Sequence, residues 1–402
     1  ATGTGKTYTA FQIVYRLLKS GMKRKILYLA DRNILVDQSI QQDFSPLEKV
    51  IHKINVAKDN KTTITSHQVY FSLYQQLIGD DDKEHFSELF DKDFFDLIIV
   101  DESSMISIEV MQMLLDAVKL GTLVVFVGDE HQLPCIGAGN CLHDLIASNV
   151  FPVFRLKENF RQKGAGTIVQ NASLINDGKM PVPNQDDFVV ISTSDDNEGY
   201  KMLCRLMTAY YDKRNPFAVQ LIEPSYQDSA GIYRMNRYVR EEICYKGWAD
   251  LSKNPMVGDK IIITDTEKKQ DKDKYDKKYP EYDYDMYING DLGVIVTITD
   301  EEVIVHDGFD DVHYDPSCLR YMDFAYSYTI HKSQGSEADT VIVYLPKSKA
   351  HMMTRSLLYT AVTRAKDMVI LVGSEKVIKS MVDNNRLVQR YTGLSFLLKS
   401  YE

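Results

Sequence analysis

The amino end of the chain carries residues whose types and spacing could bind a nucleotide. Gly3, Thr4, Gly5, Lys6 and Thr7 form a glycine-rich run, and an apolar helical pattern follows it. Glycines permit a tight turn whose backbone N–H groups bind phosphate together with the amino terminus of the next helix. Lysine adds a positive charge, and the threonine hydroxyl can hold Mg²⁺. The run therefore predicts a phosphate loop that binds ATP and Mg²⁺.

Two carboxylates follow an apolar run at 97–100. Such a run predicts a buried parallel strand, and open α/β sheets bind ligands beyond the carboxyl ends of their strands. Asp101 would hold Mg²⁺ through its water shell, whereas Glu102 would orient the attacking water and accept its proton. Taken alone, an acidic turn after a strand is an ordinary structural feature. The phosphate loop favours the catalytic interpretation.

Three further residues could act on the γ-phosphate. Gln132 follows a third apolar run and could sense the γ-phosphate through a hydrogen bond. Arg161 in LKENFRQ and Arg364 in AVTRAK could stabilise developing charge, because a guanidinium donates in a rigid fork and keeps its proton. Each arginine alone would more often be a surface ion-pair partner.

From about residue 101 onward the chain resembles the superfamily 1 DNA helicases of the RecD type, the exodeoxyribonuclease V alpha-subunit family. The matching runs are VDESSM, GDEHQLPCIGAGNCLHDLIAS, LKENFRQ, INGDLGVI, YTIHKSQGSEADTVIV and LLYTAVTRAK. The resemblance implies two RecA-like P-loop NTPase lobes that close as ATP is hydrolysed. It also implies 5′→3′ movement on single-stranded DNA, in DNA repair or recombination.

Residues 1–100 instead resemble the superfamily 2 motor of type I restriction enzyme R subunits. The matching runs are ATGTGKTYTAFQIVYRL, ILYLADRNILVDQ and DFFDLIIVDE. The RecD-type run like APTGRAA and the T-I-H-R segment are missing, and VDESSM replaces the Asp-Glu-Cys-His of the restriction enzymes. The sequence therefore reads as a junction of two motor families near 96–102, natural or engineered.

Further site residues come from the resemblance and from their position beside the motifs. Gly335 and Glu337 would lie near the phosphate and ribose of the nucleotide. Candidate nucleic-acid contacts are Arg32, Ser225, Thr329, His331 and Lys332. A satisfied core histidine is an equally good interpretation of His331. The expected partners are single-stranded DNA or a duplex end, with nuclease or repair-complex subunits as further candidates.

Composition limits the class of protein. The 402 residues are 44% hydrophobic, carry a net charge of −10 and include five cysteines. This length suffices for two or three domains with proper cores. The negative charge argues against a general DNA coat but not against a local basic groove. The cysteines lack zinc-ligand spacing, and no apolar run could span a membrane, so we expect a cytoplasmic protein with reduced thiols.

The predicted architecture is α/β, with two RecA-like lobes and a small β-barrel inserted in the second. The predicted divisions are 1–152 for the first lobe, 153–257 for the start of the second, 258–320 for the barrel with its charged hairpin, and 321–402 for the remainder. We expect the first lobe to be truncated at its amino end, because the strand that feeds the phosphate loop is missing. That strand would occupy the middle of the sheet.

The predicted function is that of an ATP-dependent DNA helicase. The restriction-like front third supports an alternative, a translocase on duplex DNA. A fragment or mosaic that binds nucleotide without turnover is a second alternative. No nuclease signature of clustered carboxylates with a partner lysine is evident.

Overall fold

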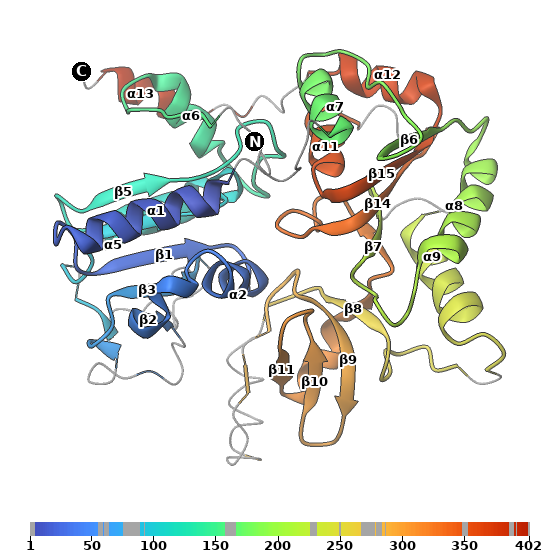
Figure 1. The fold of residues 1–402 in the computed structure, drawn as a ribbon, viewed down its shortest axis with the longest axis horizontal. Helices are drawn as coiled ribbons and strands as arrows, with labels where there is room; N and C mark the ends of the chain where they lie inside the picture. Colours follow the sequence, from blue (N-terminus) through green and yellow to red (C-terminus); the bar gives the residue numbers. More distant parts are fainter. Residues whose placement is uncertain are drawn as a thin grey trace. The chain divides into compact units, whose positions relative to one another are not determined.

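The computed structural model describes residues 5–54, 59, 64–74, 89–91, 93–156, 166–225, 231–248, 251–266, 278, 284–285, 287–347, 353–385, 390 and 392–400. The chain forms two compact units. Unit 1 combines Ala1–Gly164 with Arg386–Glu402, and unit 2 is Ala165–Asn385. The predicted division differs, because it assigned everything after 321 to the second lobe. Figure 1 labels the helices and strands.

Unit 1 contains a parallel five-stranded sheet in the order β2-β3-β1-β4-β5. Its strands are β1 (Ile26–Ala30), β2 (Ile51–Lys53), β3 (Val69–Leu73), β4 (Leu97–Val100) and β5 (Leu123–Phe126). The strand predicted at 97–100 is confirmed as β4. Every residue of β1, β3 and β4 is buried, as expected for parallel strands covered on both faces.

Helices cover both faces of this sheet (Figure 1). They are α1 (Lys6–Lys19), α2 (Asn33–Gln41), α5 (Ile108–Ala117), α6 (Cys141–Ser148) and α13 (Leu394–Ser400), with the 3₁₀ turns η1 (Ser45–Val50) and η3 (Ser103–Met105). On one face Tyr28 of β1 stacks edge-on against Phe44, which also contacts Phe11 of α1. On the other face Leu27 and Leu29 join a core cluster that includes residues of α5.

The β5 edge of this sheet is less buried than its centre. β1 pairs directly with β4 and β4 with β5, so the described sheet has no gap at its centre. Leu123 of β5 is 45% exposed. The segment 151–156 is exposed throughout, and its Phe154 is 91% exposed.

Unit 2 contains a second parallel sheet, in the order β13-β7-β14-β15-β6. Its strands are β6 (Phe188–Ile191), β7 (Val219–Glu223), β13 (Ser327–Thr329), β14 (Ala338–Leu345) and β15 (Ala365–Gly373). Its helices are α7 (Thr167–Asn176), α8 (Asp196–Tyr210), α9 (Ile232–Tyr238), the π-helix η4 (Val239–Cys244), α11 (Arg355–Val362) and α12 (Glu375–Asp383). Two parallel α/β sheets thus confirm the predicted fold class.

A five-stranded antiparallel sheet occupies the region where a small barrel was predicted. Its strands are β8 (Lys260–Ile263), β9 (Leu292–Ile298), β10 (Val303–His306), β11 (Asp311–Tyr314) and β12 (Met322–Phe324), in the order β11-β10-β9-β8-β12, and the 3₁₀ turn η5 (Pro316–Tyr321) precedes β12. Gly293 is required where β9 meets β10, since an added Cβ would lie 2.2 Å from Val305. Most of the charged hairpin at 266–287 lies outside the described residues.

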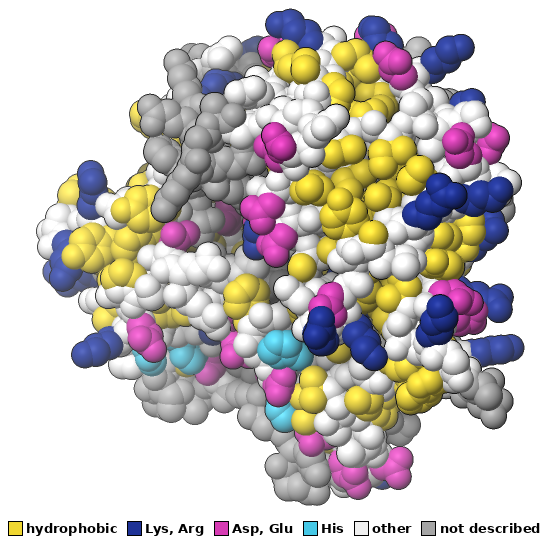
Figure 2. All heavy atoms as spheres, turned by 45° about the vertical axis from the view of Figure 1, so that its right-hand side comes forward, with side chains coloured by type: hydrophobic (Ala, Val, Ile, Leu, Met, Phe, Trp, Pro, Cys, Tyr) yellow, Lys and Arg dark blue, Asp and Glu magenta, His cyan; other side chains and the backbone are white. Residues whose placement is uncertain are grey.

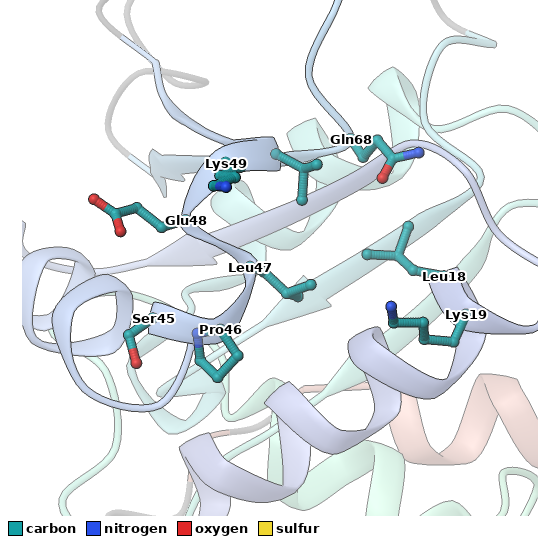
Figure 3. A pocket seen from close by; sticks show the side chains of 9 residues that line it. Leu18, Lys19, Ser45, Pro46, Leu47, Glu48, Lys49 and Gln68 are labelled. Atoms are coloured by element: carbon teal, nitrogen blue, oxygen red, sulfur yellow. The ribbon is translucent and has the colours of Figure 1, made fainter.

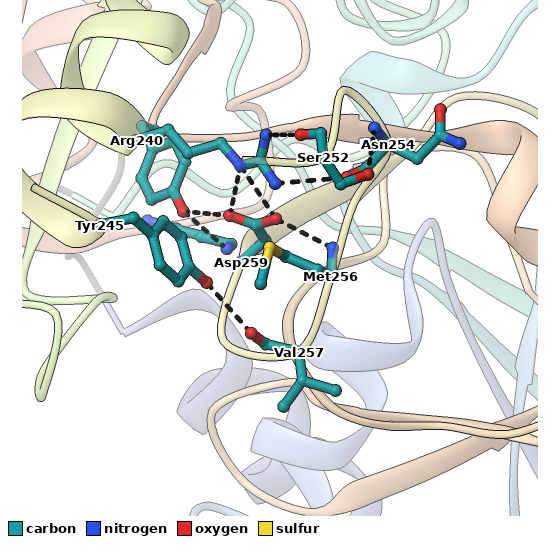
Figure 4. Close-up of polar contacts among 9 residues, drawn as sticks. Arg240, Tyr245, Ser252, Asn254, Met256, Val257 and Asp259 are labelled. Carbon is teal, nitrogen blue, oxygen red and sulfur yellow. Dashed lines mark hydrogen bonds and ion pairs between the residues drawn. The ribbon is translucent and has the colours of Figure 1, made fainter. Parts of the chain in front are cut away.

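A buried polar network joins this antiparallel sheet to the rest of unit 2 (Figure 4). Arg240 of η4 donates from Nε to Asp259 at 2.9 Å, and Tyr326 donates its hydroxyl to the same carboxylate at 2.9 Å. The next residue, Lys260, donates from Nζ to Gln220 of β7 at 2.7 Å. Burial lowers the pKa of Lys260 to about 7. Because the carboxylate of Asp259 and the amine of Lys260 both have hydrogen-bond partners, the network fixes the junction.

Candidate nucleotide and nucleic-acid sites

The described part of the predicted phosphate loop has a backbone geometry that suits phosphate binding. Gly5 caps α1 with φ 72° and ψ 36°, a left-handed conformation that glycine adopts without a Cβ penalty. Its carbonyl accepts from the backbone N–H and the hydroxyl of Thr9, both at 2.8 Å. The first N–H groups of a helix have no intrahelical acceptor and can bind an anion. Lys6 and Thr7 lie in this first turn, whereas Gly3 and Thr4 lie outside the described residues.

Asp101 lies at the carboxyl end of β4, as predicted, and is only 7% exposed. Its Oδ1 accepts the backbone N–H of Glu102 at 2.9 Å, and its Oδ2 accepts the hydroxyl of Tyr28 at 2.5 Å. Burial, followed by the charge of Glu102, raises the pKa of Asp101 to about 6. Two adjacent carboxylates in a buried place favour binding of a cation.

Glu102 directly faces the phosphate-loop lysine. Its Oε1 lies 3.8 Å from Nζ of Lys6. Its backbone is left-handed, with φ 45° and ψ 41°, a conformation that costs a non-glycine residue about 1–3 kcal/mol and is concentrated at functional sites. Its buried Oε2 has no hydrogen-bond partner among the described residues. The structure therefore brings Lys6, Asp101 and Glu102 together, with one carboxylate oxygen available for a ligand or water.

The donor set fits Mg²⁺ bound together with a nucleotide. Within the described ranges, no group of three or more His, Cys, Asp or Glu side chains could hold a metal ion alone. Mg²⁺ usually binds through one or two carboxylates plus the phosphates of its substrate and keeps several waters. Asp101, with the hydroxyl of Thr7 as a second ligand, would meet that requirement.

Sequence reasoning missed two tyrosines beside these carboxylates. Tyr28 lies within β1, where it looked like an ordinary core residue, yet its hydroxyl holds Asp101. Tyr74 follows β3, is 3% exposed, and its hydroxyl has no hydrogen-bond partner among the described residues. Burial, together with the charge of Asp101, raises the pKa of Tyr74 well above its ordinary value. A tyrosine in or just after an apolar strand looks like an ordinary core residue, so the sequence gives no sign that either hydroxyl lies beside these carboxylates.

Gln132 is buried in a turn that is fastened to the segment after β4. Its backbone N–H donates to Asp129 at 3.2 Å, and its side chain is 3% exposed. Ser103, next to Glu102, donates both its N–H and its hydroxyl to the carbonyl of Val127, at 2.9 Å and 2.8 Å. The predicted γ-phosphate sensor and the predicted base thus belong to one connected part of unit 1. Arg161 lies outside the described residues.

A surface pocket of about 450 Å³ lies at the other end of α1 (Figure 3). Leu18 and Lys19 line it from α1, and Pro46 and Leu47 line it from η1. An α-helix rises about 1.5 Å per residue, so Lys19 lies roughly 20 Å along α1 from Lys6. The pocket is therefore not part of the phosphate-loop site.

In unit 2 the structure joins the two motifs predicted to contact nucleotide and DNA. Arg364 is 3% exposed, and its guanidinium donates to the carbonyls of Thr360 at 3.2 Å and Ser336 at 3.4 Å. Gly335, beside Ser336, is left-handed with φ 79°, and Glu337 is partly exposed. Arg364 would have to exchange these contacts to reach a phosphate.

The candidate nucleic-acid residues differ in accessibility. Thr329 is 6% exposed, and its hydroxyl accepts the N–H of Lys332 at 3.2 Å, so it shapes the turn. Burial lowers the pKa of His331 and so favours its neutral form. Ser225 and Lys332 are partly exposed. Arg32 is 5% exposed and lies 3.6 Å from Asp31, an arrangement that does not favour the predicted surface contact with DNA.

Charge on the surface of unit 2 is mixed. Figure 2 shows lysine and arginine side chains interspersed with acidic ones and with apolar patches on the face that it draws. Exposed ion pairs such as Arg214–Asp212 and Arg237–Glu241 also place opposite charges next to each other on the surface. This face is not a continuous basic track.

Across the described residues, none of the helices is long and apolar enough to cross a membrane.

Comparison with known families finds two matches. Residues 1–124 match the family of the type III restriction enzyme res subunit, and residues 324–372 match the UvrD-like helicase C-terminal domain. The chain is 46% identical over 102 residues to the Escherichia coli type I restriction enzyme EcoAI endonuclease subunit, covering 25% of this chain and 12% of that protein.

RecD and Pif1 proteins are also similar to this chain. The RecBCD enzyme subunit RecD of Mycolicibacterium smegmatis is 30% identical over 326 residues, covering 74% of this chain and 53% of that protein. A solved structure of a Pif1 helicase from Bacteroides with ADP-AlF₃ and single-stranded DNA aligns with TM-score 0.49 and 14% identity, covering 92% of this chain and 93% of that one. The chain spans about half the length of RecD. The predicted resemblance to both RecD-type helicases and restriction-enzyme motors is confirmed.

Proposed function

We propose that this chain is the ATP-hydrolysing motor of a DNA helicase that acts on single-stranded DNA. One observation carries the proposal: Lys6 faces Glu102 at 3.8 Å, with the buried carboxylate of Asp101 beside them. A phosphate-facing cation and two carboxylates with different surroundings are the parts that phosphoryl transfer to water requires. The similarity to RecD and to UvrD-like helicases supports DNA as the substrate of the motor.

Each residue has a distinct role in the proposed reaction. Lys6 and the N–H groups of the first turn of α1 would hold the β- and γ-phosphates. Thr7 and Asp101 would hold Mg²⁺, which supplies charge neutralisation at the phosphates when it is bound. Glu102 would orient the attacking water and accept its proton through the carboxylate oxygen that has no described partner. Tyr28 would keep Asp101 in place.

Coupling to DNA is assigned to the second set of motifs. Gln132, Arg161 and Arg364 would act on the γ-phosphate, and the loop that contains Thr329 and Lys332 would contact the DNA strand. Gly335 and Glu337 would lie beside the nucleotide. We further propose 5′→3′ movement on single-stranded DNA. The similarity to a subunit of the RecBCD enzyme supports assembly with other proteins, for which nuclease or repair-complex subunits are the proposed candidates.

The decisive experiment measures ATP hydrolysis with and without single-stranded DNA. We expect Mg²⁺-dependent turnover that single-stranded DNA stimulates. Strand displacement from duplexes with a 5′ or a 3′ single-stranded tail then tests direction, and only the 5′-tailed duplex should be unwound. Absence of turnover under both conditions would instead favour a fragment that binds nucleotide without hydrolysing it.

A translocase on duplex DNA is a second candidate function. The 46% identity of the front quarter to a type I restriction enzyme subunit specifically favours it. A triplex-displacement assay distinguishes the two functions, because a duplex translocase displaces a third strand without separating the duplex. A helicase separates a tailed duplex instead.

A further inference from the structure

An arginine from the carboxyl-terminal segment closes around a loop of unit 1. Nη1 of Arg390 donates to the carbonyls of Gly137 and Gly139, each at 2.6 Å, and contacts Sγ of Cys135 at 3.1 Å. Nη2 donates to the carbonyl of Cys135 at 2.6 Å. One guanidinium thus contacts three carbonyls and a thiol of residues 135–139, which we call the clasped loop.

The backbone of the clasped loop has a conformation that lets three carbonyls point at one guanidinium. Gly137 and Gly139 have φ of 123° and 93°, a region that disfavours residues with a Cβ. A Cβ on Gly139 would also lie 3.1 Å from Cβ of Ile108. Three carbonyls directed at one point repel one another unless a donor lies between them, and a planar guanidinium has five N–H groups to offer.

The clasped loop contacts both segments that carry the proposed catalytic groups. Only Leu133 and Pro134 separate it from Gln132, and Leu133 is 5% exposed. On its other side the carbonyl of Ala138 accepts the N–H of Ile108 at 2.9 Å, at the start of α5. That helix directly follows the turn that begins at Glu102.

The segment that carries Arg390 has anchors of its own on unit 1. Thr392 donates its hydroxyl to Asp144 of α6. Leu394 packs against the core cluster of unit 1. The segment that carries Arg390 is therefore held on unit 1 by contacts other than those of the arginine side chain.

We propose that Arg390 is a positioning residue for ATP hydrolysis, which acts by holding the clasped loop so that Gln132 and Glu102 keep their geometry. This inference rests on the proposed function. Loss of the guanidinium removes the donor that the carbonyls of Cys135, Gly137 and Gly139 share, leaves Gly139 only the weaker contact from Sγ of Cys135, and lets both segments shift. A displacement of about 1 Å remote from the chemistry can lower a rate on the order of 10²-fold.

The test compares Arg390→Ala and Arg390→Lys with a matched control, Arg155→Ala. Arg155 is also an arginine of unit 1, but its side chain is 56% exposed and pairs with Glu130 on the surface. Turnover number and nucleotide affinity are measured separately, and the melting temperature checks folding. Labelling of Cys135 by a thiol reagent, mapped by mass spectrometry, reports directly on the loop, because Cys135 is 3% exposed in the intact protein.

We expect Arg390→Ala to lower kcat by about 10²-fold, to change nucleotide affinity less than about twofold, and to label Cys135 faster. The kcat of Arg390→Lys should lie between those of the wild type and Arg390→Ala, because the compact ammonium group of lysine replaces a planar guanidinium with several N–H donors. The control should match the wild type. Unchanged kcat in Arg390→Ala overturns the inference, whether or not labelling accelerates. If Arg390→Ala fails to fold, a wild-type kcat in Arg390→Lys overturns it. A wild type without turnover refutes the proposed function instead, and labelling still reports whether the loop is clasped.

Discussion

Nζ of Lys6 lies 3.8 Å from Oε1 of Glu102, which joins the first turn of α1 to the turn after β4. The two side chains are 12% and 14% exposed, so the pair is partly shielded from water. Glu102 reaches this position from a left-handed backbone. A γ-phosphate bound by Lys6 would therefore lie beside the carboxylate that we propose activates water.

Replacement of Lys6 by alanine should abolish ATP hydrolysis and leave the fold intact, because it removes a phosphate-facing charge and little core volume. A loss of at least about 10³-fold in kcat/KM is expected for a group that contacts the transferring phosphate. Lys19→Ala, at the other end of α1, is the matched control and should be active. Steady-state ATPase assays and circular dichroism measure both properties, and normal turnover by Lys6→Ala would refute the phosphate-loop assignment.

Glu102→Gln should retain nucleotide binding and lose turnover, because the amide keeps the size of the side chain and loses its basicity. General-base catalysis typically contributes about 10²–10⁴-fold, so a decrease of that order is expected in kcat. Isothermal titration with ATP and single-turnover hydrolysis provide the measurements. Equal losses of binding and turnover would mean that Glu102 has a structural role.

Arg364→Ala should hydrolyse ATP on the order of 10³-fold more slowly, by analogy with other transition-state arginines, and should lose stimulation by DNA. Arg355→Ala is the matched control, since Arg355 also donates to backbone carbonyls of unit 2, including that of Val382 at 2.7 Å. Melting temperatures of both variants separate structural loss from catalytic loss. DNA stimulation of the Arg364 variant by the wild-type factor would exclude Arg364 as the coupling element.

Stability should depend on pH through Lys260. Its folded pKa is lowered to about 7 by burial, whereas an unfolded lysine has a pKa of about 10.4. Between these values the unfolded state binds a proton that the folded state does not, so the free energy of unfolding rises with pH by roughly 1.4 kcal/mol per unit. Below about pH 7 both states bind the proton and the dependence ends.

Urea denaturation of the wild type and Lys260→Met between pH 7 and 9.5 measures this effect as a difference. Other titrating groups cancel in that difference, and the wild type should gain relative to the variant as pH rises. A constant difference would mean that Lys260 keeps an ordinary pKa in the folded protein.

The exposed edge strand β5 and the exposed apolar segment 151–156 should promote self-association. Phe154 is 91% exposed and Leu123 of the edge strand is 45% exposed. Exposed edges and apolar patches are recognised routes to aggregation. Phe154→Ser should raise the concentration at which light scattering detects aggregates, while Phe396→Ser, at a residue of α13 that is 75% exposed, serves as a control for general polarity. Equal improvement by both substitutions would argue against a specific role of this region.

An apolar run followed by polar residues was sufficient to predict the central strand β4. The meeting of Lys6 with Asp101 and Glu102 was also predictable, because parallel strands present their carboxyl ends on one edge. The hydroxyl of Tyr28 on Asp101 and the contact of Arg390 with the clasped loop were not. Both depend on packing between residues distant in sequence, for which no local pattern exists. The burial of Arg32 also depends on packing between residues distant in sequence, so nothing in the sequence indicated it.

Unit 2 is inserted within unit 1, because the chain leaves unit 1 after Gly164 and returns to it at Arg386. If unit 2 unfolded alone, Ala165–Asn385 would become a flexible loop that unit 1 must keep closed. A loop of that length costs on the order of 5 kcal/mol to close, comparable to the whole stability of many domains. Unfolding of the inserted unit would therefore remove much of the stability of the unit that surrounds it.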